Sequence, residues 1–200
     1  MGSAHRPITD GELGITHYSA PRMRVLDVAL DLFADHGVSG TSLQMIADAV
    51  GITKAAVYHQ FRTKEQIVLA VTERELGRLA PALEEAEAHG DGPEARDGLL
   101  VRVVEMAVRD RRLVRTLQFD PVVVRLLAEH EPFQRFMERL YRVLLSDAGL
   151  DGQIEAAMFS GAISSAVMHP LVADIDDETL LARLTDLSRR LLGLHRTSLD

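Results

Sequence analysis

Hydroxyl and lysine side chains occur in pairs between residues 50 and 65, at points where short helices are expected to begin. Thr53 precedes Lys54 and Thr63 precedes Lys64, and the 200-residue chain contains no other lysine. A hydroxyl at a helix N-cap and the free N–H groups of the first turn can bind phosphate oxygens, and a nearby ammonium group adds positive charge. This spacing predicts a surface that contacts a phosphate backbone.

The residues that follow Lys54 suit a close approach to base pairs. Ala55 and Ala56 are small enough to let a helix come near base edges and touch thymine methyl groups. Tyr58 and His59 are longer and carry polar tips that can reach the nucleic-acid backbone. We therefore expect these side chains on a helix that faces a DNA groove.

Three helical segments must position this surface. Residues 22–36 carry apolar side chains at helical spacing with aspartates opposite, and Gly37 is placed to end that helix. Residues 43–50 form a second amphipathic segment, and residues 51–53 form a three-residue turn that leads into the third segment at Lys54. Two short helices joined by a glycine-containing turn, after a longer helix, are typical of a helix-turn-helix.

The net charge of −8 argues at first against a nucleic-acid partner, but the charge is unevenly distributed. Residues 20–64 carry five basic and four acidic side chains, whereas residues 65–200 carry 16 basic and 24 acidic ones. The acidity therefore lies in the C-terminal part of the chain, and the helix-turn-helix segment is close to neutral.

The composition limits the class of protein. With 46% hydrophobic residues it is ordinary for a globular chain, and the lack of cysteine excludes disulfides, thiolate zinc sites and cysteine nucleophiles. No stretch approaches the roughly 18 apolar residues of a membrane span, and the first residues do not resemble a signal peptide. We expect a cytoplasmic protein with no membrane partner.

Helical periodicity continues through nearly the whole chain, which predicts an all-α fold of about nine or ten helices. The expected helices span roughly residues 21–36, 43–50, 54–60, 64–80, 93–109, 111–118, 121–129, 132–147, 151–168 and 176–194. Pro81 is expected to kink or end the fourth of them near Ala80. We divide the chain into a tail (1–19), a helix-turn-helix head (20–79) and a larger helical body (80–200).

The last two expected helices have the pattern of an interface. Leucines from Leu180 to Leu194 follow an alternating spacing of four and three residues, and the helix that precedes them is apolar on nearly every face. Pairing of these helices in a two-fold dimer would make a four-helix bundle, and the alternative is that they pack within the core of one chain. The candidate interface residues are Phe159, Ile163, Leu180, Leu184, Leu187 and Leu191.

A ligand cavity in the body is plausible because aromatic, methionine and polar residues are interleaved between residues 102 and 169. Alternatively, the methionines and aromatic residues fill a core, and the arginines are solvated. The candidate ligand-binding residues are Met106, Arg109, Phe119, Met137, Tyr141, Phe159 and His169.

The motifs of an enzyme are missing from this sequence. None of the eight histidines has a glutamate three residues earlier, as a di-iron site in a helical bundle needs. Glycine-rich phosphate loops and nucleophile elbows are also absent. We expect no catalytic site, no metal and no cofactor. A metal-binding regulator and a dimeric helical module without DNA-binding activity are the remaining alternatives.

The head closely resembles the tetracycline-repressor (TetR) family. The resemblance rests on Val28–Gly37, Gly40-Thr41-Ser42 with Ile46-Ala47, Gly51–Lys54, Val57–Phe61 and Thr63-Lys64-Glu65, in order and without gaps. It implies an all-helical ligand-binding and dimerising body. It also implies a transcriptional regulator, by preference a repressor, that binds a palindromic operator as a homodimer and is released by a small-molecule effector.

The resemblance also implies which residues touch DNA within a helix-turn-helix that spans Ser42 to Phe61. Family members often have glycine followed by serine or threonine where this chain has Ala55-Ala56, so a hydroxyl contact to DNA is lost here. The implied DNA-binding residues are Thr41, Ser42, Gln44, Thr53, Lys54, Ala55, Tyr58, His59 and Lys64.

Overall fold

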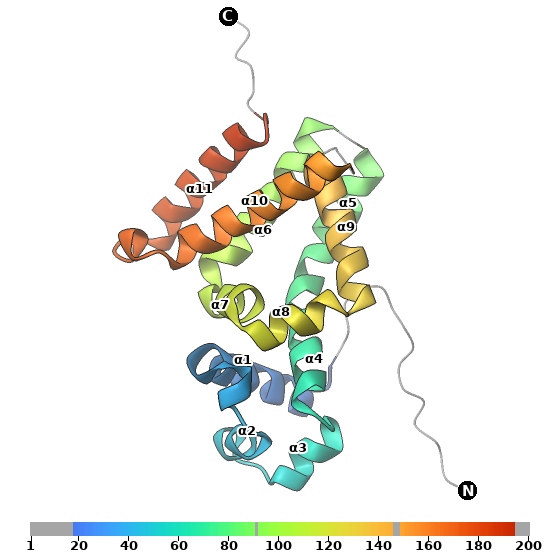
Figure 1. Cartoon of the computed structure of the whole chain (residues 1–200), viewed down its shortest axis with the longest axis vertical. Helices are drawn as coiled ribbons and strands as arrows, with labels where there is room; N and C mark the ends of the chain where they lie inside the picture. The colour runs from blue at the N-terminus through green and yellow to red at the C-terminus, as the bar shows by residue number, and fades with distance from the viewer. Residues whose placement is uncertain (1–17, 91, 146–148, 195–200) are drawn as a thin grey trace, which may run out of the picture.

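The computed structural model describes residues 18–90, 92–145 and 149–194. These residues form eleven α-helices and two short 3-10 helices, and no strand occurs among them (Figure 1). The prediction of an all-α fold with an N-terminal helix-turn-helix and a larger helical body is therefore confirmed. The predicted tail, residues 1–19, lies outside the described residues except for Tyr18 and Ser19.

Four helices build the head at the lower end of the molecule in Figure 1. They are α1 (Ala20–Gly40), α2 (Leu43–Val50), α3 (Lys54–Gln60) and α4 (Lys64–Leu76). The regular part of α1 is interrupted at Gly37, whose φ of 70° and ψ of 163° suit glycine and strain other residues. The expected break at this glycine is present, and one more helical turn follows it.

The body contains the remaining elements. They are η1 (Gly77–Leu79), α5 (Ala80–His89), α6 (Pro93–Arg109), α7 (Arg111–Phe119), α8 (Pro121–Ala128), α9 (Glu131–Leu145), α10 (Leu150–Met168), η2 (Pro170–Val172) and α11 (Asp177–Leu191).

Helix α5 differs from the sequence-based expectation. Pro81 is expected to kink or end a helix near Ala80, and the 3-10 turn η1 interrupts the helix just before that residue. Pro81 then lies in the first turn of α5, which continues to His89. Proline is compatible with a first turn because the N–H groups there have no intrahelical acceptor. Residues 82–89 are accordingly helical although no helix is expected there, and α4 ends at Leu76, where the 3-10 turn begins.

The buried apolar residues form two clusters, one mainly in the head and one in the body. The head cluster also contains Leu113 from α7 and Val123 and Leu127 from α8. Within α4 the side chains up to Val71 belong to the head cluster, and those from Leu76 belong to the body cluster. Helices α7 and α8 thus belong to the body in sequence but help to bury the side of the head that faces the body.

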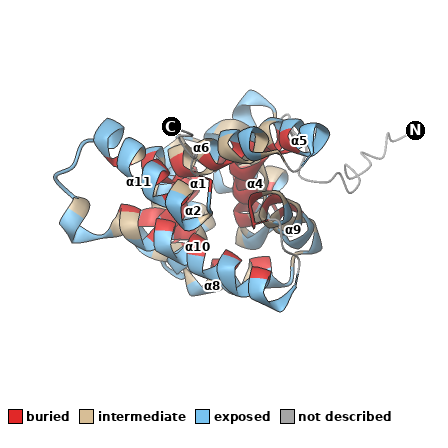
Figure 2. Cartoon of the chain, turned by 90° about the horizontal axis from the view of Figure 1, so that it is seen from above, coloured by how far each residue is buried: buried red, intermediate tan, exposed pale blue. Residues whose placement is uncertain are grey.

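Helix α11 lies along α6 and is held there by a bidentate ion pair. The guanidinium of Arg189 donates to both carboxylate oxygens of Asp97, at 2.5 and 2.8 Å. Buried residues line the inward faces of the helices, and exposed residues cover their outer faces (Figure 2). Every described helix is too short or too polar to cross a lipid bilayer.

Candidate functional site

Local capping interactions define the two short helices α2 and α3 and the turn between them. The Ser42 hydroxyl accepts a hydrogen bond from the N–H of Met45 at 3.1 Å, and the Thr53 hydroxyl accepts one from Ala56 at 3.1 Å. Gly51, with a φ of 78°, ends α2 in the left-handed conformation. Each short helix therefore begins at a capped end, and the turn between them has a defined shape.

One side of α3 is turned toward solvent. Val57 is fully buried in the head cluster, whereas Lys54, Ala55, Tyr58 and His59 are exposed. Tyr58 is 49% exposed, so this large aromatic residue is not packed into the head cluster. Together these four side chains form the outward face of α3, where an amphipathic helix presents its contacts to a partner.

Arg62 belongs to this exposed surface and was not among the expected contact residues. Its guanidinium carbon lies 5.4 Å from the centre of the Tyr58 ring, within reach of a cation–π interaction. It therefore adds positive charge beside the polar tip of Tyr58. The sequence signal that could have found it is the spacing of four residues between Tyr58 and Arg62, which places them on one side of the chain as α3 ends.

Seven of the nine predicted DNA-contact residues are exposed on or beside α2 and α3, and Thr41 is an exception. Thr41 is only 1% exposed, and its hydroxyl lies 2.8 Å from the carbonyl oxygen of Gly37 and 3.1 Å from that of Leu32. The hydroxyl expected to contact a phosphate is therefore buried and lies against the interrupted end of α1.

Lys64 is the second exception, since its ammonium group serves the same end of α1. Its Nζ donates to the carbonyl oxygens of Val38 and Thr41, both at 2.7 Å. The last carbonyls of a helix lack intrahelical partners, and a cation there satisfies them and complements the helix dipole. Two of its three N–H groups are used inside the head, so Lys64 is first a structural residue.

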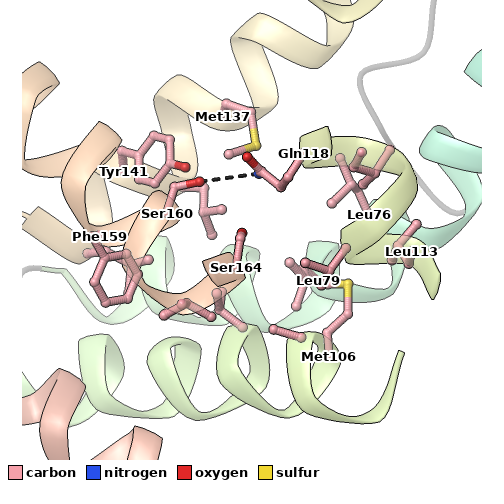
Figure 3. Close-up of a pocket in the computed structure, with 17 residues that line it drawn as sticks. Leu76, Leu79, Met106, Leu113, Gln118, Met137, Tyr141, Phe159, Ser160 and Ser164 are labelled. Atoms are coloured by element: carbon pink, nitrogen blue, oxygen red, sulfur yellow. Dashed lines mark hydrogen bonds between the residues drawn. The ribbon is translucent and has the colours of Figure 1, made fainter. Parts of the chain in front are cut away.

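A small chamber lies in the body between α6, α7, α9 and α10, with a volume of about 100 Å³ (Figure 3). Most of its lining is apolar and includes Leu79, Met106, Leu113, Met137, Phe159 and Ile163. The polar side chains in the lining are Gln118, Tyr141, Ser160 and Ser164. Burial raises the pKa of Tyr141, and a hydrogen bond with Ser160 opposes that rise only in part. The phenol is therefore neutral at physiological pH.

The chamber contains four of the seven predicted ligand-binding residues, namely Met106, Met137, Tyr141 and Phe159. The other three lie elsewhere. Arg109 is on the surface and is paired with Glu105 at 3.0 Å, and Phe119 is 52% exposed at the end of α7. His169 caps η2, where its Nδ1 accepts a hydrogen bond from the N–H of Leu171 at 3.2 Å. The predictions for these three side chains are not supported by their positions.

Residues 25–71, which contain the capped turn and the exposed face of α3, match the family model described as bacterial regulatory proteins, tetR family. This part of the chain, the head, belongs to the tetR family. The match covers the same head that carries the resemblance in sequence, so the expected family is confirmed.

Two curated relatives illustrate the similarity of this chain to known proteins. It is 38% identical over 94 residues to the transcriptional regulator AcrR of Shigella flexneri, covering 46% of this chain and 43% of AcrR. It is 28% identical over 135 residues to the repressor AcnR of Corynebacterium diphtheriae, covering 64% of this chain and 67% of AcnR.

The similarity in fold extends through the body. The structure of FadR from Bacillus subtilis, solved in complex with stearoyl-CoA, superposes with a TM-score of 0.67 at 17% identity. That superposition covers 87% of this chain and 99% of the FadR chain. At this level of identity the comparison concerns the fold alone.

The burial of the body divides the six predicted interface residues into two groups. Phe159, Ile163, Leu180 and Leu184 are buried in the chain's own core, with exposed fractions of 2 to 9%, so they offer no surface to a second copy. Leu187 and Leu191 are 53% and 61% exposed. On α10 the exposed large apolar residues are instead Leu150, Ile154 and Met158.

Asp120, between α7 and α8, joins the body to the tetR-family head. Its Oδ1 accepts hydrogen bonds from the N–H groups of Val122 at 2.9 Å and Val123 at 3.3 Å, which caps α8. Its Oδ2 accepts a hydrogen bond of 2.7 Å from the N–H of Val38, just after the break in α1. A second link between the same helices is the ion pair of Arg112 with Asp31.

Proposed function

We propose that this chain is a transcriptional repressor that binds a palindromic operator as a homodimer and is released by a small-molecule effector. The observation that carries the proposal is the exposed face of α3, with Lys54, Ala55, Tyr58 and His59 projecting from a helix-turn-helix. Because α3 is short and carries the small residues Ala55 and Ala56 in its first turn, it can enter a major groove with that turn near base edges.

Contacts to phosphate set the position of such a helix on DNA. The exposed hydroxyls of Ser42 and Thr53 lie at the first turns of α2 and α3, where N–H groups point outward. Lys54, Tyr58 and Arg62 add cationic and polar tips around the same surface. These groups contribute affinity that is independent of base sequence and falls as salt is added.

The exposed apolar residues of α10 and α11 support a homodimer. Leu150, Ile154 and Met158 on α10 and Leu187 and Leu191 on α11 are at least half exposed in the single chain. Helices that expose large apolar residues bury them when two copies pair, and two helices from each copy make a four-helix bundle. Two-fold symmetry then presents two α3 helices to half-sites about 34 Å apart, which requires a palindrome.

Release by an effector requires the body to have two arrangements, of which only one fits the operator. The chamber touches α7 through Leu113 and Gln118, and α7 leads directly to Asp120, which holds Val38 in the head. A ligand that prefers a shifted position of α7 would alter the placement of the head relative to the body. It would lower DNA affinity by the ratio of its affinities for the two arrangements.

The proposal is tested by selecting bound sequences from a random pool of double-stranded DNA with the full chain. We expect enrichment of a palindrome with half-sites about one helical turn apart. The enriched DNA is then used to screen metabolites for release of the complex. Failure to enrich any palindrome would contradict the operator proposal and favour a helical module that does not bind DNA. Effectors that bind without changing operator affinity would contradict the release mechanism.

A further inference from the structure

The chamber of the body is lined by uncharged side chains. Among the described residues that surround it, the polar ones are two serines, one glutamine and one tyrosine, and the rest are apolar. A separate surface depression shares Leu79 and Met106 with the chamber wall, and its charged lining residues, Arg78, Arg102, Glu105, Arg109 and Asp110, are not part of the chamber lining. A charged ligand group in the chamber would therefore lose its hydration and gain no ionic partner.

The polar side chains of the chamber form a connected cluster from three helices. The side-chain N–H of Gln118 on α7 donates to the hydroxyl of Ser160 on α10 at 3.2 Å (Figure 3). The hydroxyl of Tyr141 on α9 points toward the same serine (Figure 3). Amide and hydroxyl groups both donate and accept hydrogen bonds, so this cluster can satisfy a ligand hydroxyl or a ligand carbonyl.

The chamber adjoins a wider cleft between α9 and α10. The two share Met137, Tyr141 and Ser160, and the cleft has a volume of about 460 Å³. The chamber alone is smaller than the roughly 150 Å³ cavity that holds a benzene ring, whereas chamber and cleft together fall within the ~300–1,000 Å³ of typical ligand sites. A ligand must therefore be elongated and extend from the chamber into the cleft.

The outer part of the cleft has no net preference for one sign of charge. Glu138 and Arg142 both line it, and Gln134 and Gln153 supply the other polar groups. Arg142 also acts electrostatically on Glu87 of α5, where it helps to lower the pKa of that carboxyl. The cleft thus offers polar groups of both charge signs to the rest of the ligand, with no excess of either.

We propose that chamber and cleft form one binding site for an uncharged, elongated amphiphile. Its apolar end lies among Leu113, Phe159 and Ile163, and a hydroxyl or carbonyl oxygen hydrogen-bonds the cluster of Gln118, Ser160 and Tyr141. Burying an unpaired carboxylate or ammonium group costs several kcal/mol of binding free energy, and a neutral oxygen avoids that cost by hydrogen bonding. This assignment rests on the proposed function only in taking the body as the effector-binding part.

The test uses three matched probes of equal chain length, octan-1-ol, octanoate and octylammonium, titrated calorimetrically into the full chain at pH 7 without DNA. We expect octan-1-ol to bind at least about tenfold more tightly than either ion. Ser160→Ala should weaken octan-1-ol binding about fivefold, which corresponds to one neutral hydrogen bond. Ser165→Ala, on the exposed side of the same helix, should leave it unchanged.

Equal or tighter binding of octanoate or octylammonium overturns the assignment, and so does the absence of saturable octan-1-ol binding. An equal effect of the two serine variants overturns the role of Ser160. A separate measurement of operator affinity with and without octan-1-ol keeps the two proposals apart. Selective binding without any change in operator affinity would contradict effector release but leave the ligand class standing. Operator release by an effector, combined with preferred binding of octanoate, would contradict the ligand class but leave effector release standing.

Discussion

The backbone N–H of Val38 donates a 2.7 Å hydrogen bond to Oδ2 of Asp120, a residue 82 positions later in the chain. The donor lies where α1 is interrupted, and the acceptor is the N-cap of α8. One carboxylate thus completes the hydrogen bonding of two helix ends, one in the head and one in the body. Because α7 lines the chamber, packs Leu113 into the head cluster and ends at Asp120, this bond is one of the links between the chamber and the head.

Asp120→Ala removes both functions of this carboxylate. We expect it to lower the free energy of unfolding by about 2–4 kcal/mol, since an N-cap is lost and the N–H of Val38 keeps no partner. Asp120→Asn retains one acceptor oxygen and should cost about half as much. Urea denaturation of both variants measures these changes. A loss below about 0.5 kcal/mol in the alanine variant would show that the bond contributes little to stability.

Gly37→Ala places a side chain where the backbone favours glycine. Its φ is 70° and its ψ is 163°, and an added Cβ would lie 3.2 Å from Asp120 Oδ2. We expect a loss of about 1–3 kcal/mol in unfolding free energy and a displaced contact with Asp120. Gly40→Ala is the matched control, because its Cβ would meet only the Cβ of His36 at 3.5 Å, an ordinary contact. Equal stability of the two variants would contradict the importance of this conformation.

The two lysines of the chain should have separable effects. Lys54→Ala should weaken binding to all DNA sequences and leave the free energy of unfolding unchanged. It should also reduce the slope of the logarithm of the DNA-binding constant against the logarithm of salt concentration by the equivalent of about one phosphate contact. Lys64→Ala should instead lower the unfolding free energy by about 1–3 kcal/mol, because the carbonyl oxygens of Val38 and Thr41 lose their shared donor. Anisotropy titrations over a salt series and urea denaturation distinguish the two. Stability losses of equal size would refute this division of roles.

The double variant Leu187→Glu with Leu191→Glu should dissociate the proposed dimer without unfolding the chain. Both side chains are more than half exposed in the single chain, so glutamate is tolerated there but repels a second copy. Val124→Glu, at an apolar position on α8 that is 48% exposed, is the control and should remain dimeric. Light scattering at micromolar concentration measures the mass. A wild-type monomer, or a dimeric double variant, would exclude this interface.

The pairing of Glu87 with Arg139 should make stability depend on pH in the acid range. Two hydrogen bonds from Arg139, at 2.7 and 3.0 Å, hold the pKa of Glu87 below its usual value. Because the folded-state pKa is the lower one, this contribution is complete above the unfolded pKa and is lost as pH falls through the folded pKa.

The matching variant is Glu87→Gln, compared with Glu84→Gln at an exposed position of the same helix. We expect Glu87→Gln to be less stable than the wild type at neutral pH, with the difference shrinking as pH falls below the usual glutamate value of about 4.3. Urea denaturation between neutral pH and about pH 3 checks this. A constant difference across that range would refute the linkage, as would an equal effect of Glu84→Gln.

Local sequence signals were sufficient to place the helix-turn-helix. Helices α2 and α3 begin and end at the expected residues, because Ser42, Gly51 and Thr53 act on their immediate neighbours in the chain. The exposed face of α3 followed from the burial of Val57 and Phe61 at helical spacing. Residues whose partners lie within four positions could be assigned correctly from their types alone.

Thr41 and Lys64 have partners in the structure that their types did not reveal, because these partners lie in another segment of the head. Their types suit phosphate contacts, but the break at Gly37 leaves carbonyl groups that both side chains satisfy. The cost of leaving buried carbonyls without donors decides their roles, and that cost is set by where the end of α1 lies relative to α4.

The sequence by itself determined the all-helical class, the head and the outward face of α3, since these depend on periodicity and capping along one segment. Only the tertiary structure decided which leucines of α10 and α11 are left exposed, which residues meet in the chamber, and that Asp120 reaches Val38. Apolar periodicity specifies that a helix face is buried, but it does not specify the surface that covers it. That choice depends on how all the helices pack together, and no single segment carries this information.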